Sequence, residues 1–81
     1  MFNRDNENYV YQLVSKNIKK QRKLQNITQE QLANKINYSK QFISNIESNN
    51  HQTFALGTLW AIALALNVNI SVFFDEDILK N

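Results

Sequence analysis

Apolar residues in the first part of the chain recur at the spacing of an amphipathic helix. One helical face gathers Val10, Leu13, Val14 and Ile18, while lysines occupy the opposite face. Intervals of three and four residues match the period of an α-helix that buries one stripe of its surface. The pattern therefore predicts a first helix over about residues 9–24, preceded by a flexible polar arm at residues 1–8.

Two short helices with capping residues are expected next. Thr28 and Gln31 fit a capping box, in which the Thr hydroxyl accepts from the backbone N–H three residues on and the Gln side chain reaches back. Ser39 is placed to cap the following helix, and Asn37 to end the preceding one in the left-handed conformation. The buried stripes contain Leu32, Ala33 and Ile36 in the first helix and Phe42, Ile43 and Ile46 in the second. Two such helices joined by about three residues form a helix-turn-helix.

Apolar residues fill almost every position of the next segment. Residues 54–66 read FALGTLWAIALAL and end at Asn67, and residues 70–74 add a short turn with two adjacent phenylalanines. A helix that is apolar on all sides is buried on all sides, which an 81-residue domain cannot achieve alone. We therefore expect a two-fold homodimer; the alternative is that these residues simply line the monomer core. The expected interface residues are Trp60, Leu64, Phe73 and Phe74.

The charge of the chain is distributed unevenly. Between residues 10 and 45, seven basic residues are accompanied by Glu30 alone, which gives a local charge of +6 against a net charge of +2 for the whole chain. An acidic tail is expected at residues 76–81, after a domain that spans residues 9–75. A basic front half indicates a polyanionic partner such as nucleic acid, although a run of charges is also typical of a solvated helix face.

The composition disfavours several classes of function. The chain has no cysteine, so we expect neither disulfides nor thiolate metal sites, and a reducing cytoplasmic compartment fits. With one histidine and no glycine-rich phosphate loop, we expect no enzyme activity, no cofactor and no small-molecule ligand. The adjacent acidic residues at 75–77 point apart and make a poor metal site. The polar N-terminus does not resemble a signal peptide, and the longest apolar stretch, residues 59–66, is too short to span a membrane.

Two sequence runs together resemble a known family of DNA-binding domains. The runs ITQEQLANKINYSKQFISNIE and LWAIALALNVNISVFF resemble the phage-repressor/Cro-type (XRE) helix-turn-helix family, over roughly residues 14–74. Within it, restriction–modification controller proteins look closest, since they share the length, the one-domain layout and the VFF-like segment. The resemblance implies a compact all-α, five-helix, phage-repressor-like fold with the helix-turn-helix at helices two and three. It also implies a sequence-specific transcription regulator of duplex DNA, either a repressor or a controller.

Positions on the two short helices are assigned to DNA contacts by this resemblance. Base contacts are implied at Lys40, Gln41, Ser44 and Asn45, on the outer face of the second helix. Backbone contacts are expected at Gln29, Ser39, Lys35, Asn49 and Asn50. Gln29 would stand at a helix N-terminus, where N–H groups and the helix dipole favour a phosphate. Arg22 and Glu47 match a structural ion pair of the family. Asn37 stands where the family usually has glycine, and Ala55 stands where Ser or Thr often caps the fourth helix, which puts that cap in doubt.

The residue types at the expected base-reading positions suit the major groove. A glutamine amide at Gln41 pairs with adenine N6 and N7, and Asn45 could repeat this pairing one turn on. Lys40 donates to guanine O6 and N7, or simply to phosphate. Phe42 either completes the core or packs its edge on a thymine methyl group. The alternative for the whole face is a polar surface that touches only water.

A protein-interaction module is the rival function. An antitoxin or an adaptor could use the same fold mainly to bind another protein, with the apolar fourth helix as its docking surface. Such a module has no need of Lys, Gln, Ser and Asn on the outer face of the second short helix, beside a front half of charge +6. The pattern therefore favours DNA binding.

Overall fold

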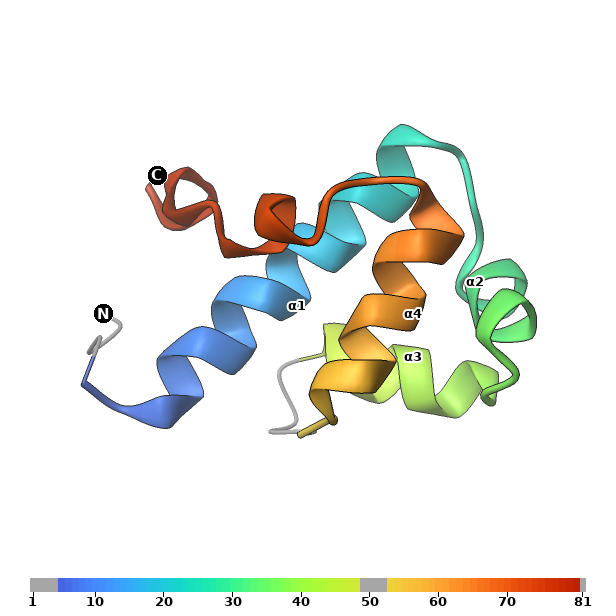
Figure 1. Cartoon of the computed structure of the whole chain (residues 1–81), viewed down its shortest axis with the longest axis horizontal. Helices are drawn as coiled ribbons and strands as arrows, with labels where there is room; N and C mark the ends of the chain where they lie inside the picture. The colour runs from blue at the N-terminus through green and yellow to red at the C-terminus, as the bar shows by residue number, and fades with distance from the viewer. Residues whose placement is uncertain (1–4, 49–52, 81) are drawn as a thin grey trace.

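The computed structural model describes residues 5–48 and 53–80, and within these ranges every regular element is helical (Figure 1). In chain order the elements are the α-helices α1 (Glu7–Leu24), α2 (Gln29–Ile36), α3 (Lys40–Glu47) and α4 (Leu56–Leu66), and the 3-10 helices η1 (Ile70–Phe74) and η2 (Glu76–Leu79). The all-α prediction is confirmed, with two short helices, α2 and α3, where the helix-turn-helix was expected. The expected fifth helix is the 3-10 helix η1.

Helical structure reaches into the segments that the sequence assigned to the arm and the tail. α1 begins at Glu7 because the side chain of Asn6 accepts a hydrogen bond from the N–H of Asn8, so residues 7 and 8 belong to the helix and not to a flexible arm. Part of the expected acidic tail forms η2, which packs against α1. There the Tyr9 hydroxyl donates to the carboxylate of Glu76.

Three asparagines supply the left-handed turns that the single glycine of the chain does not supply. Asn26, Asn37 and Asn67 have φ angles of 56°, 61° and 55°, and the last two end α2 and α4. Asparagine is, after glycine, the residue that tolerates this conformation best. Both helices therefore end at the asparagines that the sequence predicted.

Side chains cap α2 and α3 as the sequence predicted. The Thr28 hydroxyl accepts from the N–H of Gln31 at 3.0 Å, and Gln31 Oε1 accepts from the N–H of Thr28 at 2.8 Å, which completes the capping box of α2. The Ser39 hydroxyl caps α3 by accepting from the N–H of Phe42 at 3.1 Å. α4 starts after Ala55 with no side-chain cap, in keeping with the departure noted at that position.

α4 packs against α2, α1 and η1, while α1 also contacts α3 directly (Figure 1). It contributes Leu59, Ile62, Ala63 and Leu66 to the core, whose other buried members are Val14, Ile18, Leu32, Ala33, Ile43, Ile46 and Phe73. Phe73 is completely buried, whereas the neighbouring Phe74 is exposed. The expectation that Phe73 lies in a dimer interface is therefore wrong, because the turn of η1 directs its ring into the monomer core.

A buried asparagine on α1 holds the C-terminal segment in place. Asn17 Nδ2 donates to the backbone carbonyls of Phe73, Asp75 and Leu13 at 2.9, 3.0 and 3.1 Å. A buried polar group must be hydrogen-bonded to offset its lost hydration, and here two of the three partners are carbonyls of η1 and of the residue after it. Asn17 therefore fixes which way η1 faces.

No single helix within 5–48 and 53–80 is long and apolar enough to cross a membrane. α4 and the segment Ile70–Leu79 meet that test only as a pair, across a bend of 114°.

Candidate nucleic-acid interface

The outer face of α3 carries the side chains that the sequence assigned to base contacts. Ile43 and Ile46 are buried and attach α3 to the core. The opposite side of the helix contains Lys40 and Gln41, which are exposed, and Ser44 and Asn45, which are partly exposed. At 3.6 residues per turn these four positions share one side of the helix. The structure thus brings them together on the surface, with their polar groups directed away from the core.

Two of these side chains are hydrogen-bonded to each other. Gln41 Nε2 donates to Asn45 Oδ1 at 2.8 Å, one helical turn along α3. This contact was not expected from the sequence, although residues four apart on a helix are neighbours.

Phe42 lies between the core and the turn of the helix-turn-helix. Its ring is partly buried and packs against the core cluster. Tyr38 stacks on it, with ring centroids 4.4 Å apart and an interplanar angle of 29°, and the Tyr38 hydroxyl is 3.0 Å from Thr58 Oγ1 on α4. The core role and the thymine-methyl contact of Phe42 both stay predictions, and the stacked Tyr38 favours the core role. Sequence reasoning missed Tyr38; the signal available was a second aromatic residue four positions before Phe42.

A bidentate ion pair joins the end of α1 to the end of α3. Arg22 Nε donates to Glu47 Oε2 and Arg22 Nη2 donates to Glu47 Oε1, both at 2.8 Å. Arg22 Nη1 also donates to the carbonyl of Ile27 at 2.8 Å. The side chains of Arg22 and Glu47 are only 9% and 2% exposed. The hydrogen bond that Arg22 donates to Glu47 raises the pKa of the Arg22 guanidinium, against the opposing effect of burial, so the arginine stays charged.

Three of the residues expected to contact the DNA backbone lie in the described part of the chain, on α2 and at the start of α3. Gln29, the first residue of α2, donates from Nε2 to Glu47 Oε1 at 3.1 Å, which leaves one hydrogen of that amide for a phosphate. The Ser39 hydroxyl accepts its capping bond and keeps its own proton to donate. Lys35 is exposed on the last turn of α2. Asn49 and Asn50 lie outside the described residues.

The arrangement offers hydrogen bonds and positive charge, and no metal-binding cluster accompanies it in the described part of the chain. No three His, Asp or Glu side chains there come close enough to hold a metal ion. Lys19, Lys20, Lys23, Lys35 and Lys40 are all exposed on α1, α2 and α3. Such a surface attracts a polyanion.

Comparisons with known proteins agree with this geometry. Residues 18–73 match the helix-turn-helix family HTH_3. The structure is similar to crystal structures of two single-residue mutants of the restriction–modification controller protein C.Esp1396I, each 38% identical in sequence. The TM-scores are 0.78 and 0.75; the first match covers 90% of this chain and 95% of that chain, and the second covers 89% and 93%. A comparison with curated proteins finds no significant match.

The family match spans the whole helix-turn-helix and α4, and it confirms the resemblance to XRE-type domains. The prediction that the chain is not an enzyme agrees with this match, because the family consists of DNA-binding regulators. The chain belongs to the HTH_3 helix-turn-helix family and is a DNA-binding transcriptional regulator.

Proposed function

We propose that this regulator acts in the cytoplasm as a homodimer, binds a two-fold symmetric operator in duplex DNA and reads its sequence with α3. The observation that carries the proposal is the division of α3 into two sides. Ile43 and Ile46 anchor the helix, while the opposite side exposes a lysine, two amides and a hydroxyl. A solvent-facing helix with this composition at the front of a basic surface fits the major groove.

Each of the four outer side chains has a partner among the base edges. Gln41 offers an amide donor and acceptor to adenine, and Lys40 offers a donor to guanine. Ser44 and Asn45 extend the contact one turn along the helix. A well-formed bidentate contact discriminates between bases by about 1–3 kcal/mol. One such helix therefore reads only a few base pairs.

Phosphate contacts would fix the position of the helix without reading sequence. Gln29 and Ser39 start α2 and α3, where N–H groups favour an anion. Lys35 adds charge beside them, and Asn49 and Asn50 stay predictions from the sequence.

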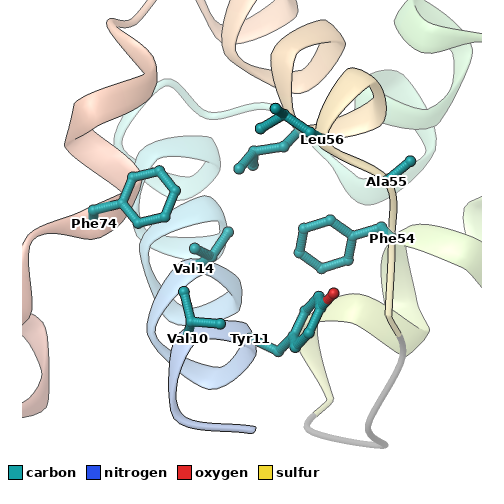
Figure 2. A pocket seen from close by; sticks show the side chains of 8 residues that line it. Val10, Tyr11, Val14, Phe54, Ala55, Leu56 and Phe74 are labelled. Atoms are coloured by element: carbon teal, nitrogen blue, oxygen red, sulfur yellow. The ribbon is translucent and has the colours of Figure 1, made fainter. Parts of the chain in front are cut away.

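An exposed apolar surface supports the homodimer. Leu56, Trp60 and Leu64 follow one another at four-residue intervals on α4 and are 73%, 53% and 65% exposed, and Phe74 on η1 is 42% exposed. Figure 2 shows Leu56 and Phe74 at the border of a hollow of about 170 Å³ that Val10, Tyr11 and Phe54 also line. Apolar groups gathered in this way mark an interaction surface. A second copy of the chain, related by a two-fold axis, would cover it and place two α3 helices about 34–36 Å apart, or a multiple of that spacing.

Sedimentation analysis at micromolar concentration tests the dimer. A species of twice the chain mass is the expected result. A monomer alone, with and without DNA, would contradict the homodimer.

The same apolar surface also fits an antitoxin or adaptor, so the experiment must separate DNA binding from protein docking. Affinity for a duplex is measured between about 50 and 200 mM salt, where contacts with several phosphates lower it steeply and log K falls linearly with log salt. Lys40→Gln should reduce that slope, whereas Lys80→Gln, at the far C-terminal end, should not. No binding to DNA, or an affinity independent of salt, would favour the adaptor.

The similarity to a restriction–modification controller protein favours a restriction–modification context for this chain as well. Control by its own concentration, through dimerisation, then follows as the mode of regulation.

A further inference from the structure

The side-chain amides of Gln41 and Asn45 form one hydrogen-bonded unit on the outer face of α3. Gln41 Nε2 donates a hydrogen bond to Asn45 Oδ1, with 2.8 Å between the two atoms, one turn along the helix. Gln41 is exposed and Asn45 is partly exposed, so the bond lies at the surface that the proposed function turns toward DNA.

A glutamine amide can face a base in two orientations, and the orientation decides which base it recognises. Adenine in the major groove presents the N7 acceptor and the N6 donor, so a glutamine must bring one N–H and one carbonyl oxygen to the base. Gln41 has two Nε2 hydrogens and Oε1. With one hydrogen given to Asn45, the other hydrogen and Oε1 are left, which is the set that adenine requires.

We propose that Asn45 is a positioning residue, which holds the amide of Gln41 in the orientation that reads adenine. A Gln41 amide that flipped alone would bring Oε1 against Asn45 Oδ1, where two acceptors meet without a hydrogen between them. The two amides therefore change orientation only together, and Asn45 opposes a flip of Gln41 alone before DNA arrives. Holding a flexible side chain in its binding conformation also lowers the entropy that binding must overcome.

Asn45 keeps a reading role of its own in this arrangement. Its Oδ1 accepts from Gln41, and both Nδ2 hydrogens are left to donate. Donors at this place match an acceptor edge, namely thymine O4 or guanine O6 and N7. The two residues would then read neighbouring base pairs in a fixed order, Gln41 an adenine and Asn45 a base with acceptors.

The inference rests on the proposed function, and base selectivity tests it. Selection from random duplexes with the full chain gives the operator, and Gln41→Ala identifies the base pair that Gln41 reads. Selectivity is the affinity for that operator divided by the affinity for the same duplex with this one pair changed. The unmodified chain should discriminate by about 5- to 150-fold at this pair, and Gln41→Ala should lose the discrimination.

Two substitutions of Asn45 separate positioning from reading. Asn45→Ala removes the acceptor that holds Gln41, so selectivity at the Gln41 base pair should fall several-fold although Gln41 is still present. Asn45→Asp keeps an acceptor for Gln41 Nε2 but has no donors, so it should retain selectivity at the Gln41 pair and lose it at the next pair. A ratio taken within one variant removes the general repulsion between the new carboxylate and phosphates. Asn8→Ala, which removes an exposed amide from α1, is the matched control and should change neither ratio.

The outcomes separate a failure of the positioning role of Asn45 from a failure of the proposed function. If Asn45→Ala leaves the ratio at the Gln41 pair within about twofold of the unmodified chain, the scatter expected of residues that do not interact, the positioning role is overturned while the proposed function stands. The same holds if Asn45→Asp loses that ratio as completely as Asn45→Ala. If no motif is selected at all, the proposed function falls, and this inference with it.

Discussion

Replacing Glu47 by alanine should destabilise the fold and weaken DNA binding together. Glu47 accepts two hydrogen bonds from Arg22 and one from Gln29, and its side chain is almost completely buried. The substitution leaves the guanidinium of Arg22 buried without its counter-charge, while the bond from Arg22 to the Ile27 carbonyl alone persists. The tie between the end of α1 and the end of α3 is lost at the same time.

The expected size follows from this burial. Removing one partner of a buried ion pair costs about 3–5 kcal/mol, against a total stability of roughly 4–12 kcal/mol for a chain of this length. With a urea dependence of about 1 kcal/mol per molar for a small domain, the unfolding midpoint should fall by about 3–5 M. DNA affinity at a temperature where the variant is still folded should also fall, because α3 is no longer fixed to α1.

Urea unfolding followed by circular dichroism measures the effect, with two controls. The double variant Arg22→Met with Glu47→Leu removes both charges and should recover most of the lost stability. Asp77→Asn breaks the exposed pair between Asp77 and Lys80 and should leave the midpoint unchanged. A midpoint for Glu47→Ala equal to that of the unmodified chain would refute the reasoning.

Three further predictions follow from the same structure. Leu64→Ser should weaken the homodimer by roughly 30- to 1000-fold, since losing about 1–2 kcal/mol of apolar burial counts twice in a symmetric pair; Leu24→Ser, a similarly exposed leucine on α1, should leave sedimentation unchanged. Asn17→Leu should cost about 1–3 kcal/mol in urea unfolding, because carbonyls of η1 lose their donor; an unchanged midpoint would count against the role of Asn17. Because the hydrogen bond that Arg22 donates to Glu47 raises the pKa of Arg22, the stability linked to that shift is full below the ordinary arginine pKa and is lost only as pH rises through the higher folded value. Titration of Arg22 should therefore make no difference to the unfolding midpoint between pH 6 and 9.

Local sequence signals predicted the elements of this fold well. The capping box at Thr28 and Gln31, the cap at Ser39 and the left-handed Asn37 each depend on residues within one turn of one another, so the sequence contains all that decides them. The start of α1 at Glu7 has such a signal as well, in Asn6 followed by an acidic first turn, but the repeat of apolar residues begins only at Val10.

The remaining features depend on contacts between distant segments. Phe73 and Phe74 are identical neighbours, and only the path of η1 over α1, held by Asn17, decides which ring is buried. The stacking of Tyr38 on Phe42 and its bond to Thr58 require α3 and α4 to be packed first. The outer face of α3 was predictable because helical periodicity fixes it, whereas the bond between Gln41 and Asn45 depends on side-chain conformation.

The central claim, that the outer face of α3 enters the DNA groove, can be tested with a single thiol. The chain has no cysteine, so Ser44→Cys places a unique reactive group on that face, and Asn8→Cys places one at the exposed start of α1 as the control. The rate of maleimide alkylation is measured with and without saturating duplex, and binding is verified in the same sample. Bound DNA should slow alkylation at position 44 by at least about tenfold, because an α-helix fills the major groove, and should leave position 8 unaffected. Equal rates at position 44 with DNA bound would contradict the account.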